Sequence, residues 1–254
     1  MVSSWGTFWG VSAGAGDPAW LTVQGQHILR TVDLVAFPQD RQGQPGVAYR
    51  IIHSHLRPEQ EVMALALPFV QDQAILQQAW QQAIDQLWPW LASGRDVAFV
   101  CEGDVSLYST FTYLAQTLRQ RQPEVPIHAI PGVCSPLAAA AVLGDPLALG
   151  EEKIAILPAM YSVNELESVL AWADVVVLMK VSAVFDQVWQ WLAAHQLLQQ
   201  ASLVVEGGSS QQQIYRTLVG LEDFRPPYFS LVVIWKNRSP SHVSLQEYSL
   251  FLSR

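Results

Sequence analysis

The chain alternates between short runs rich in β-branched and other apolar residues and longer amphipathic segments, and this alternation is the strongest constraint on its fold. The apolar runs predict strands, and the amphipathic segments predict helices. A helix between two strands returns the chain across the sheet, so we expect strands paired in parallel through right-handed crossovers. The sequence therefore predicts an α/β fold.

The predicted elements extend along almost the whole chain. In the first half we expect strands at residues 7–11, 33–37, 97–101 and 127–130, and helices at 22–30, 71–91 and 108–119. In the second half we expect strands at 153–157, 175–180, 202–205 and 228–235, and helices at 135–142, 163–171, 184–194 and 211–218. The chain is long enough for one domain or two, and proline and glycine interrupt the pattern between residues 122 and 132, so a break between two α/β domains, residues 1–125 and 126–254, is expected there.

Composition excludes several classes of protein. The 254 residues are half hydrophobic, which is enough to bury one core or two. A net charge of −8 argues against nucleic acid as a general partner, because phosphate binding requires a basic surface. Two cysteines and six scattered histidines predict neither a disulfide scaffold nor a metal site. With no apolar run long enough to span a bilayer and no signal-peptide pattern in residues 1–6, we expect a cytoplasmic protein without a membrane partner.

One turn carries a pattern typical of ligand binding. A buried strand is expected to end near residue 100, and residues 101–111 read CEGDVSLYSTF. In α/β sheets, ligands bind at the carboxyl ends of the strands. There Gly103 would let a ligand approach the backbone, and Asp104 would accept hydrogen bonds from a hydroxyl or amine. A plain turn in which Asp104 caps the next helix is an equally good interpretation.

Two further turns follow predicted strands. Residues 10–18 read GVSAGAGDP, but the glycines do not fit the dinucleotide pattern G-x-G-x-x-G, and no acidic residue ends the next strand. Asp17 before Pro18 is consistent with a helix cap. Residues 130–141 read IPGVCSPLAAAA, which predicts a Pro-Gly turn followed by an alanine-rich helix with Ser135 as its N-cap.

Taken together, these turns and the segment VLMKV at 177–181 resemble, in order and spacing, the tetrapyrrole methylases. These are the S-adenosylmethionine-dependent enzymes of sirohaem and cobalamin biosynthesis. The resemblance extends over essentially the whole chain. Within the family, CEGD followed by LYSTF, together with ILPA at 156–159, is most similar to the precorrin-2 C20-methyltransferase branch.

The resemblance implies a two-domain tetrapyrrole methylase fold, with S-adenosylmethionine held in a cleft between the domains, and a homodimer. The first loop departs from the family pattern: Ser12 stands where glycine is common and Ala15 where proline is common, and Val105 replaces the proline usual after Gly-Asp. These replacements are small or apolar, so we expect the loop shape to persist. The positions implied to contact the donor are Ala15, Glu102, Gly103, Asp104, Leu107, Cys134, Ser135, Met179, Gly207 and Ser230.

The implied reaction is methylation of C20 of precorrin-2 or of cobalt-factor II, with S-adenosylhomocysteine as the second product. Glu102, Tyr108 and Asp17 are candidates for a general base by their placement, and none has a partner evident in the sequence. Two alternatives remain open at this point. One is methylation at another tetrapyrrole position, and the other is a non-catalytic module that binds a tetrapyrrole or the donor.

A tetrapyrrole of this kind carries many carboxylates, and one segment of the chain is suited to bind them. Residues 38–58 combine turn-forming proline and glycine with several basic side chains in an otherwise acidic protein. Arginine forks match carboxylate geometry, so we expect a substrate clamp here, although solvated surface charge is an alternative interpretation. The basic residues are Arg41, Arg50, Arg57, His53 and His55.

Overall fold

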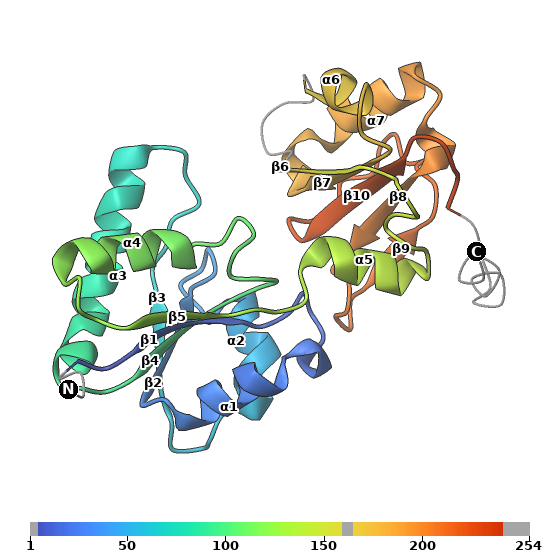
Figure 1. Ribbon diagram of the computed structural model, residues 1–254. Coiled ribbons are helices and arrows are strands. Elements are labelled where there is room, and N and C mark those ends of the chain that lie inside the picture. The colour runs from blue at the N-terminus through green and yellow to red at the C-terminus, as the bar shows by residue number, and fades with distance from the viewer. Residues whose placement is uncertain (1–4, 159–164, 241–254) are drawn as a thin grey trace. The chain divides into compact units, whose positions relative to one another are not determined.

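The computed structural model of the protein describes residues 5–158 and 165–240, and it divides the chain into two compact units, Met1–Cys134 and Ser135–Arg254. Each unit has its own five-stranded sheet covered by helices (Figure 1). The division falls later than the boundary expected after residue 125, because the strand at 127–130 pairs with the sheet of the first unit.

The first unit is a parallel α/β sandwich. Its sheet has the order β3-β2-β4-β1-β5, and every neighbouring pair in it is parallel. Two short 3₁₀ helices lie at Pro18–Trp20 and His53–His55. The elements are β1 (Phe8–Ser12), α1 (Val23–Thr31), β2 (Leu34–Pro38), α2 (Val47–Ile52), β3 (Glu61–Leu65), α3 (Gln73–Ala92), β4 (Val97–Cys101), α4 (Phe111–Arg121) and β5 (Ile127–Ile130).

The central strand β4 shows how this unit builds two cores. All five of its residues are buried, and successive side chains point to opposite faces of the sheet. Val97 and Phe99 pack in the core under α3 and α4, whereas Ala98 and Val100 pack in the core under α1 and α2. Figure 1 shows these two helix pairs on opposite sides of the sheet. A run that is apolar without alternation is therefore a strand buried on both faces.

The second unit has a mixed sheet in the order β6-β7-β10-β8-β9. One core lies between the sheet and α6 and α7, and another lies between the sheet and α5. Short 3₁₀ helices lie at Val181–Val184 and Leu198–Gln200. The elements are α5 (Ser135–Leu143), β6 (Ile154–Pro158), α6 (Leu166–Leu170), β7 (Val175–Met179), α7 (Phe185–Ala194), β8 (Ala201–Val205), β9 (Gln213–Tyr215) and β10 (Ser230–Trp235).

Some sequence predictions are corrected in this unit. Parallel pairing holds for β6 and β7, but β10 is antiparallel to β7 and β8, and β9 is antiparallel to β8. No helix separates β8, β9 and β10, so no crossover forces them to be parallel. The predicted helix at 211–218 is wrong, since strand β9 lies there. For the predicted helix at 163–171, residues 163 and 164 lie outside the described residues, as does position 159 of the ILPA motif.

The first unit also contains elements that the sequence did not predict. Strand β3 lies at the edge of the sheet. Its first residues are exposed, so the strand does not appear in the sequence as an apolar run. Helix α2 lies inside the segment expected to be a loop, with Ala48, Ile51 and Ile52 buried against the sheet. The basic segment is therefore partly a packed helix.

Candidate functional site

The three turns singled out in the sequence meet in the first unit. They follow β1, β4 and β5, which are parallel neighbours, so their carboxyl ends lie at the same edge of the sheet. The amide of Gly14 donates to the carbonyl of Gly103 at 3.2 Å, and the amide of Gly103 donates to the carbonyl of Gly14 at 2.8 Å. Both glycines have left-handed backbones, with φ of 80° and 69°, which favour glycine. We call the loops 13–17, 102–108 and 131–134 the three-loop site.

Ser12 ties the three strand ends together. Its side chain is fully buried, and its hydroxyl donates to the carbonyl of Ile130 at 2.7 Å and accepts from the amide of Val105 at 2.9 Å. One hydroxyl thus joins the end of β1 to the end of β5 and to the turn after β4. The sequence showed Ser12 only as a departure from the family loop, and nothing in its neighbours indicates this role.

Asp104 holds the same loops from the other side. Its Oδ2 accepts from the amide of Gly132 at 2.8 Å, and its Oδ1 accepts from the amide of Ser106 at 2.8 Å and from the Ser106 hydroxyl. Burial acts to raise the pKa of Asp104, but the hydrogen bonds from Ser106 and Gly132 outweigh it and hold the pKa below its ordinary value. At neutral pH the group is therefore a carboxylate that organises the loops.

Gly132 is required by close packing. A Cβ at this position would lie 2.4 Å from the Cβ of Ser12 and 3.2 Å from the carbonyl oxygen of Gly103. Both distances are shorter than ordinary van der Waals contact, so the Pro-Gly turn can approach the other two loops only because it has no side chain there.

The remaining candidates of the first unit lie in or beside these loops. Ala15, Glu102, Leu107 and Cys134 are half-buried. Tyr108 is 46% exposed and has a left-handed backbone with φ of 52°, a conformation that a bulky residue rarely adopts. Such residues often mark functional sites.

The carboxylate of Asp17 and the thiol of Cys101, both near the site, have structural roles. The Oδ1 of Asp17 accepts from the amide of Ala19 at 2.8 Å and caps the 3₁₀ helix Pro18–Trp20, as the sequence indicated. Burial raises the pKa of Cys101 to about 12, so this residue stays a thiol and is a core side chain rather than a nucleophile. Ser135, which the sequence predicted as the N-cap of the helix, is instead the first residue of α5.

The candidates of the second unit also share one sheet edge. Met179 ends β7, Gly207 follows β8, and Ser230 begins β10. Because β10 is antiparallel to both neighbours, Ser230 pairs with Val205 and the next residue, Leu231, pairs with Met179. The edge therefore collects three residues that are far apart in the chain.

This second edge contains two features typical of binding sites. The hydroxyl of Ser230 is buried and makes no hydrogen bond to any residue that the structure describes. A buried hydroxyl without a partner is costly, and a bound ligand can supply that partner. Lys180 and Glu206, which directly follow β7 and β8, have left-handed backbones with φ of 57° and 47°.

The five basic residues of segment 38–58 do not share one environment. Arg50 donates to the carbonyl of Pro45 at 3.3 Å, and the His53 ring lies 2.8 Å from the carbonyl of Arg50. The His55 ring lies between the side chain of Gln26 and the carbonyl of Pro18. These contacts are local to the segment and its neighbours.

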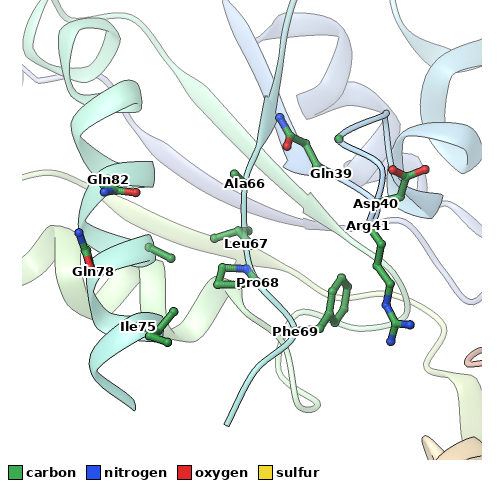
Figure 2. Close-up of a pocket in the computed structure, with 12 residues that line it drawn as sticks. Gln39, Asp40, Arg41, Ala66, Leu67, Pro68, Phe69, Ile75, Gln78 and Gln82 are labelled. Atoms are coloured by element: carbon green, nitrogen blue, oxygen red, sulfur yellow. The ribbon is translucent and has the colours of Figure 1, made fainter. Parts of the chain in front are cut away.

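The other two basic residues, Arg57 and Arg41, also lie in different environments. Arg57 contacts the carbonyl of Arg30 at the end of α1 and forms an ion pair with Glu59 at 3.3 Å. Arg41 lines a cavity beside α3, together with Phe69, a residue that the sequence did not indicate (Figure 2). The structure therefore brings one residue of the predicted clamp, Arg41, to a cavity.

Residues 5–158 and 165–240 contain neither a metal-binding cluster nor a membrane-spanning helix. Within that part of the chain, no group of three histidine, cysteine or acidic side chains could hold a metal ion. No helix there is long and apolar enough to cross a membrane.

Comparison with known sequences gives relatives over most of the chain. Residues 7–222 match the tetrapyrrole (corrin/porphyrin) methylases. The cobalt-precorrin-2 C(20)-methyltransferase of Salmonella typhimurium is 32% identical over 232 residues, which are 91% of this chain and 97% of the relative. The cobalamin biosynthesis protein CobIJ of Mycobacterium tuberculosis is 31% identical over 241 residues, 92% of this chain. The chain spans only 46% of that longer protein.

Solved structures share the fold at lower identity. A cobalt precorrin-4 methyltransferase is 19% identical with a TM-score of 0.68, covering 90% of this chain and 94% of the other. A uroporphyrin-III C-methyltransferase from Thermus thermophilus complexed with S-adenyl homocysteine is 16% identical with a TM-score of 0.65, covering 91% and 92%. These neighbours confirm the predicted α/β fold class. With the sequence match over residues 7–222, they lead to one conclusion: the chain belongs to the tetrapyrrole methylase family.

Proposed function

We propose that this protein transfers a methyl group from S-adenosylmethionine to C20 of precorrin-2, or of its cobalt-containing counterpart, in cobalamin biosynthesis. The observation that carries the proposal is the alignment with the Salmonella C20-methyltransferase over nearly the full length of both chains. Two features support it. The three-loop site has glycine backbone that a ligand can approach closely, and the sheet edge at Ser230 has a buried hydroxyl without a described partner.

When bound, S-adenosylmethionine supplies a methyl group on a sulfonium centre, for which a neutral thioether is the leaving group. In this proposal the backbone at Gly103 and the side chains of Ala15, Glu102, Leu107 and Cys134 line the donor site of the first unit. Asp104 keeps the loops in place, because its carboxylate is already engaged by Ser106 and Gly132. The second unit offers the buried Ser230 hydroxyl as a hydrogen-bond donor at the sheet edge that also holds Met179 and Gly207, and Ser135 begins its helix α5.

On the acceptor, C20 forms a bond to the methyl carbon and loses its proton, while the pair of the broken carbon–sulfur bond stays on sulfur. Holding the two reactants in line contributes up to about 7–11 kcal/mol. The candidates to accept the proton are Glu102 and Tyr108, in the loop after β4, and Asp17, in the loop after β1. Glu102→Gln or Tyr108→Phe should lower kcat about 10²-fold or more if that residue is the base.

The test is anaerobic incubation of the purified protein with S-adenosylmethionine and, separately, with metal-free precorrin-2 and cobalt-factor II. The expected result is one added methyl group at C20, identified by product mass and by NMR. Both acceptors are used because no residue of the site distinguishes the metal state. A methyl at another carbon would support the first alternative, and donor binding without turnover would support the non-catalytic module.

A matched pair of variants ties the activity to the three-loop site. Gly103→Ala should weaken binding of S-adenosylhomocysteine, because alanine is strained at a φ of 69° and the backbone must move. Gly144→Ala introduces the same strain at a φ of 68° in a turn after α5, with open space around it. Equal loss of affinity in the two variants would contradict the placement of the donor.

We further propose that the protein is a cytoplasmic homodimer. Members of the resembled family are generally homodimers, and both cysteines are free thiols. Light scattering on the purified protein, whose chain mass is 28.2 kDa, tests the assembly.

A further inference from the structure

A second concave region of the first unit lies beside the end of β2 and β3. It is a cavity of about 650 Å³, lined by the segments that follow these two strands and by the first turns of α3. Since β2 and β3 are parallel to β4 and β1, their carboxyl ends lie along the same sheet edge as the three-loop site. The cavity is thus placed where a ligand larger than the donor would extend.

One part of the cavity is apolar. Leu67, Pro68 and Ile75 face one another across the space between the β3–α3 connection and α3 (Figure 2). Phe69, the next residue along, is 57% exposed. An exposed aromatic ring next to other apolar side chains is a surface on which a flat conjugated ring can pack.

The polar part of the cavity contains one cation. The guanidinium of Arg41 lies 5.9 Å from the centre of the Phe69 ring, and Figure 2 shows the two side chains extending next to each other. Arg41 makes no hydrogen bond or ion pair with the described residues, so its donors are free to bind a ligand.

The other charged residue lining the cavity has a structural role. The Oδ1 of Asp40 accepts from the amides of Gln42 and Gln44, both at 2.9 Å, and so shapes the turn that presents Arg41. The side-chain amides of Gln78 and Gln82 on α3 line the opposite wall and add neutral hydrogen-bond donors.

We propose that this cavity binds a carboxylate-bearing ring of the acceptor, with Arg41 pairing with the carboxylate and Phe69 packing against the ring. This inference rests on the proposed function, because that function supplies an acceptor with flat conjugated parts and several carboxylates. A planar guanidinium suits a carboxylate, and the adjacent ring suits the macrocycle. Anchoring one side of the macrocycle here directs another part of it towards the three-loop site.

The experiment measures acceptor binding without turnover. Wild type, Arg41→Ala, Arg41→Lys and Phe69→Ala are titrated anaerobically with precorrin-2 in the absence of donor, and binding is followed by absorbance. Arg41→Ala should raise the Kd for the acceptor about tenfold or more, as expected for loss of a charge-assisted hydrogen bond. Arg41→Lys should recover part of the loss, and Phe69→Ala should also weaken binding. The affinity for S-adenosylhomocysteine should stay unchanged in all three variants.

Arg119→Ala is the matched control, since it removes one exposed arginine from the surface of α4, away from the cavity. Its acceptor affinity should equal that of wild type. If Arg41→Ala and Phe69→Ala bind acceptor as wild type does, while wild type methylates it, the cavity proposal is overturned and the proposed function stands. If wild type binds no tetrapyrrole at all, both are overturned.

Discussion

Ser12 shows how one buried hydroxyl can organise a ligand site. Its hydroxyl donates to the carbonyl of Ile130 and accepts from the buried amide of Val105, which has no other hydrogen-bond acceptor among the described residues. The family loop commonly has glycine at this position, so in this chain the side chain takes on a bracing role that a glycine cannot perform. The Cβ of Ser12 also packs against Gly132 and leaves no room for a side chain there.

This packing predicts a double-mutant cycle. Gly132→Ala should destabilise the protein, because the new Cβ meets the Cβ of Ser12 at 2.4 Å. Ser12→Gly should cost about 1–3 kcal/mol, because it removes both hydrogen bonds of the hydroxyl and leaves the buried Val105 amide without its acceptor. In the double variant the clash between the two Cβ atoms is gone, so Gly132→Ala should cost less than it does alone. Urea unfolding of the four proteins measures this coupling, and strictly additive costs would show that the two residues act independently.

At the residue scale, the sequence indicated Gly103, whose backbone is left-handed, but not the left-handed backbones of Tyr108, Lys180 and Glu206. Gly103 and Asp104 were recognisable because glycine followed by a carboxylate at a strand end is a local pattern. Ser12 and Phe69 were not, because the groups that they contact, such as Ile130 for Ser12 and Arg41 for Phe69, are remote in the chain. The arginine segment was recognised by its composition. Only the tertiary structure shows that Arg50 belongs to the packed helix α2, whereas Arg41 lines the cavity.

At the element scale, the fully buried strands were predicted, whereas β3 and β9, which are partly exposed, were not. The buried strand β4 is a continuous apolar run, and β8 is apolar at every position except Ser202. Strand β9 lies in a stretch where Ile214 and Leu218 have helical spacing. Pairing of β9 with β8, together with a hydrogen bond of 2.9 Å from the Ser202 hydroxyl to the carbonyl of Arg216, overrides that spacing.

The residue after β9 also ties this strand to the turn after α5. Arg216 donates to the buried carboxylate of Asp145 at 3.0 Å and to the carbonyl of Leu143 at 2.6 Å. Arg216→Ala should therefore lower the free energy of unfolding by about 1–3 kcal/mol, because it weakens the compensation of a buried charge. Arg225→Ala is the control, since among the described residues this arginine donates only to the carbonyls of Glu222 and Phe224, close to it in the chain. Equal effects of the two variants in urea unfolding would contradict the structural role of Arg216.

At the scale of the whole molecule, each unit buries its own cores. The sheet of the first unit is covered on both faces by helices from the same unit, and its strands pair only with one another. The second unit likewise encloses two cores of its own. The boundary between the units is therefore set by the sheet with which each strand pairs.

This organisation predicts the behaviour of two fragments. Residues 1–134 expressed alone should fold and unfold cooperatively, because β5 completes the sheet beside β1. Residues 1–125, which end at the boundary expected from the sequence, lack β5 and the Ile130 carbonyl that Ser12 binds. That fragment should be markedly less stable or aggregate through the uncovered edge of β1. Circular dichroism during thermal unfolding compares the two, and equal stability would favour the earlier boundary.

The sequence by itself determined the α/β class, the places of the buried strands, and the resemblance that leads to the family. All of these depend on patterns that are local or that recur in a fixed order along the chain. Tertiary structure alone decided the antiparallel pairing of β10, the unit to which β5 belongs, the bracing role of Ser12, and the single arginine that reaches the cavity. These features depend on contacts between residues distant in sequence, and hydrophobic periodicity does not encode which distant strand or side chain will be the neighbour.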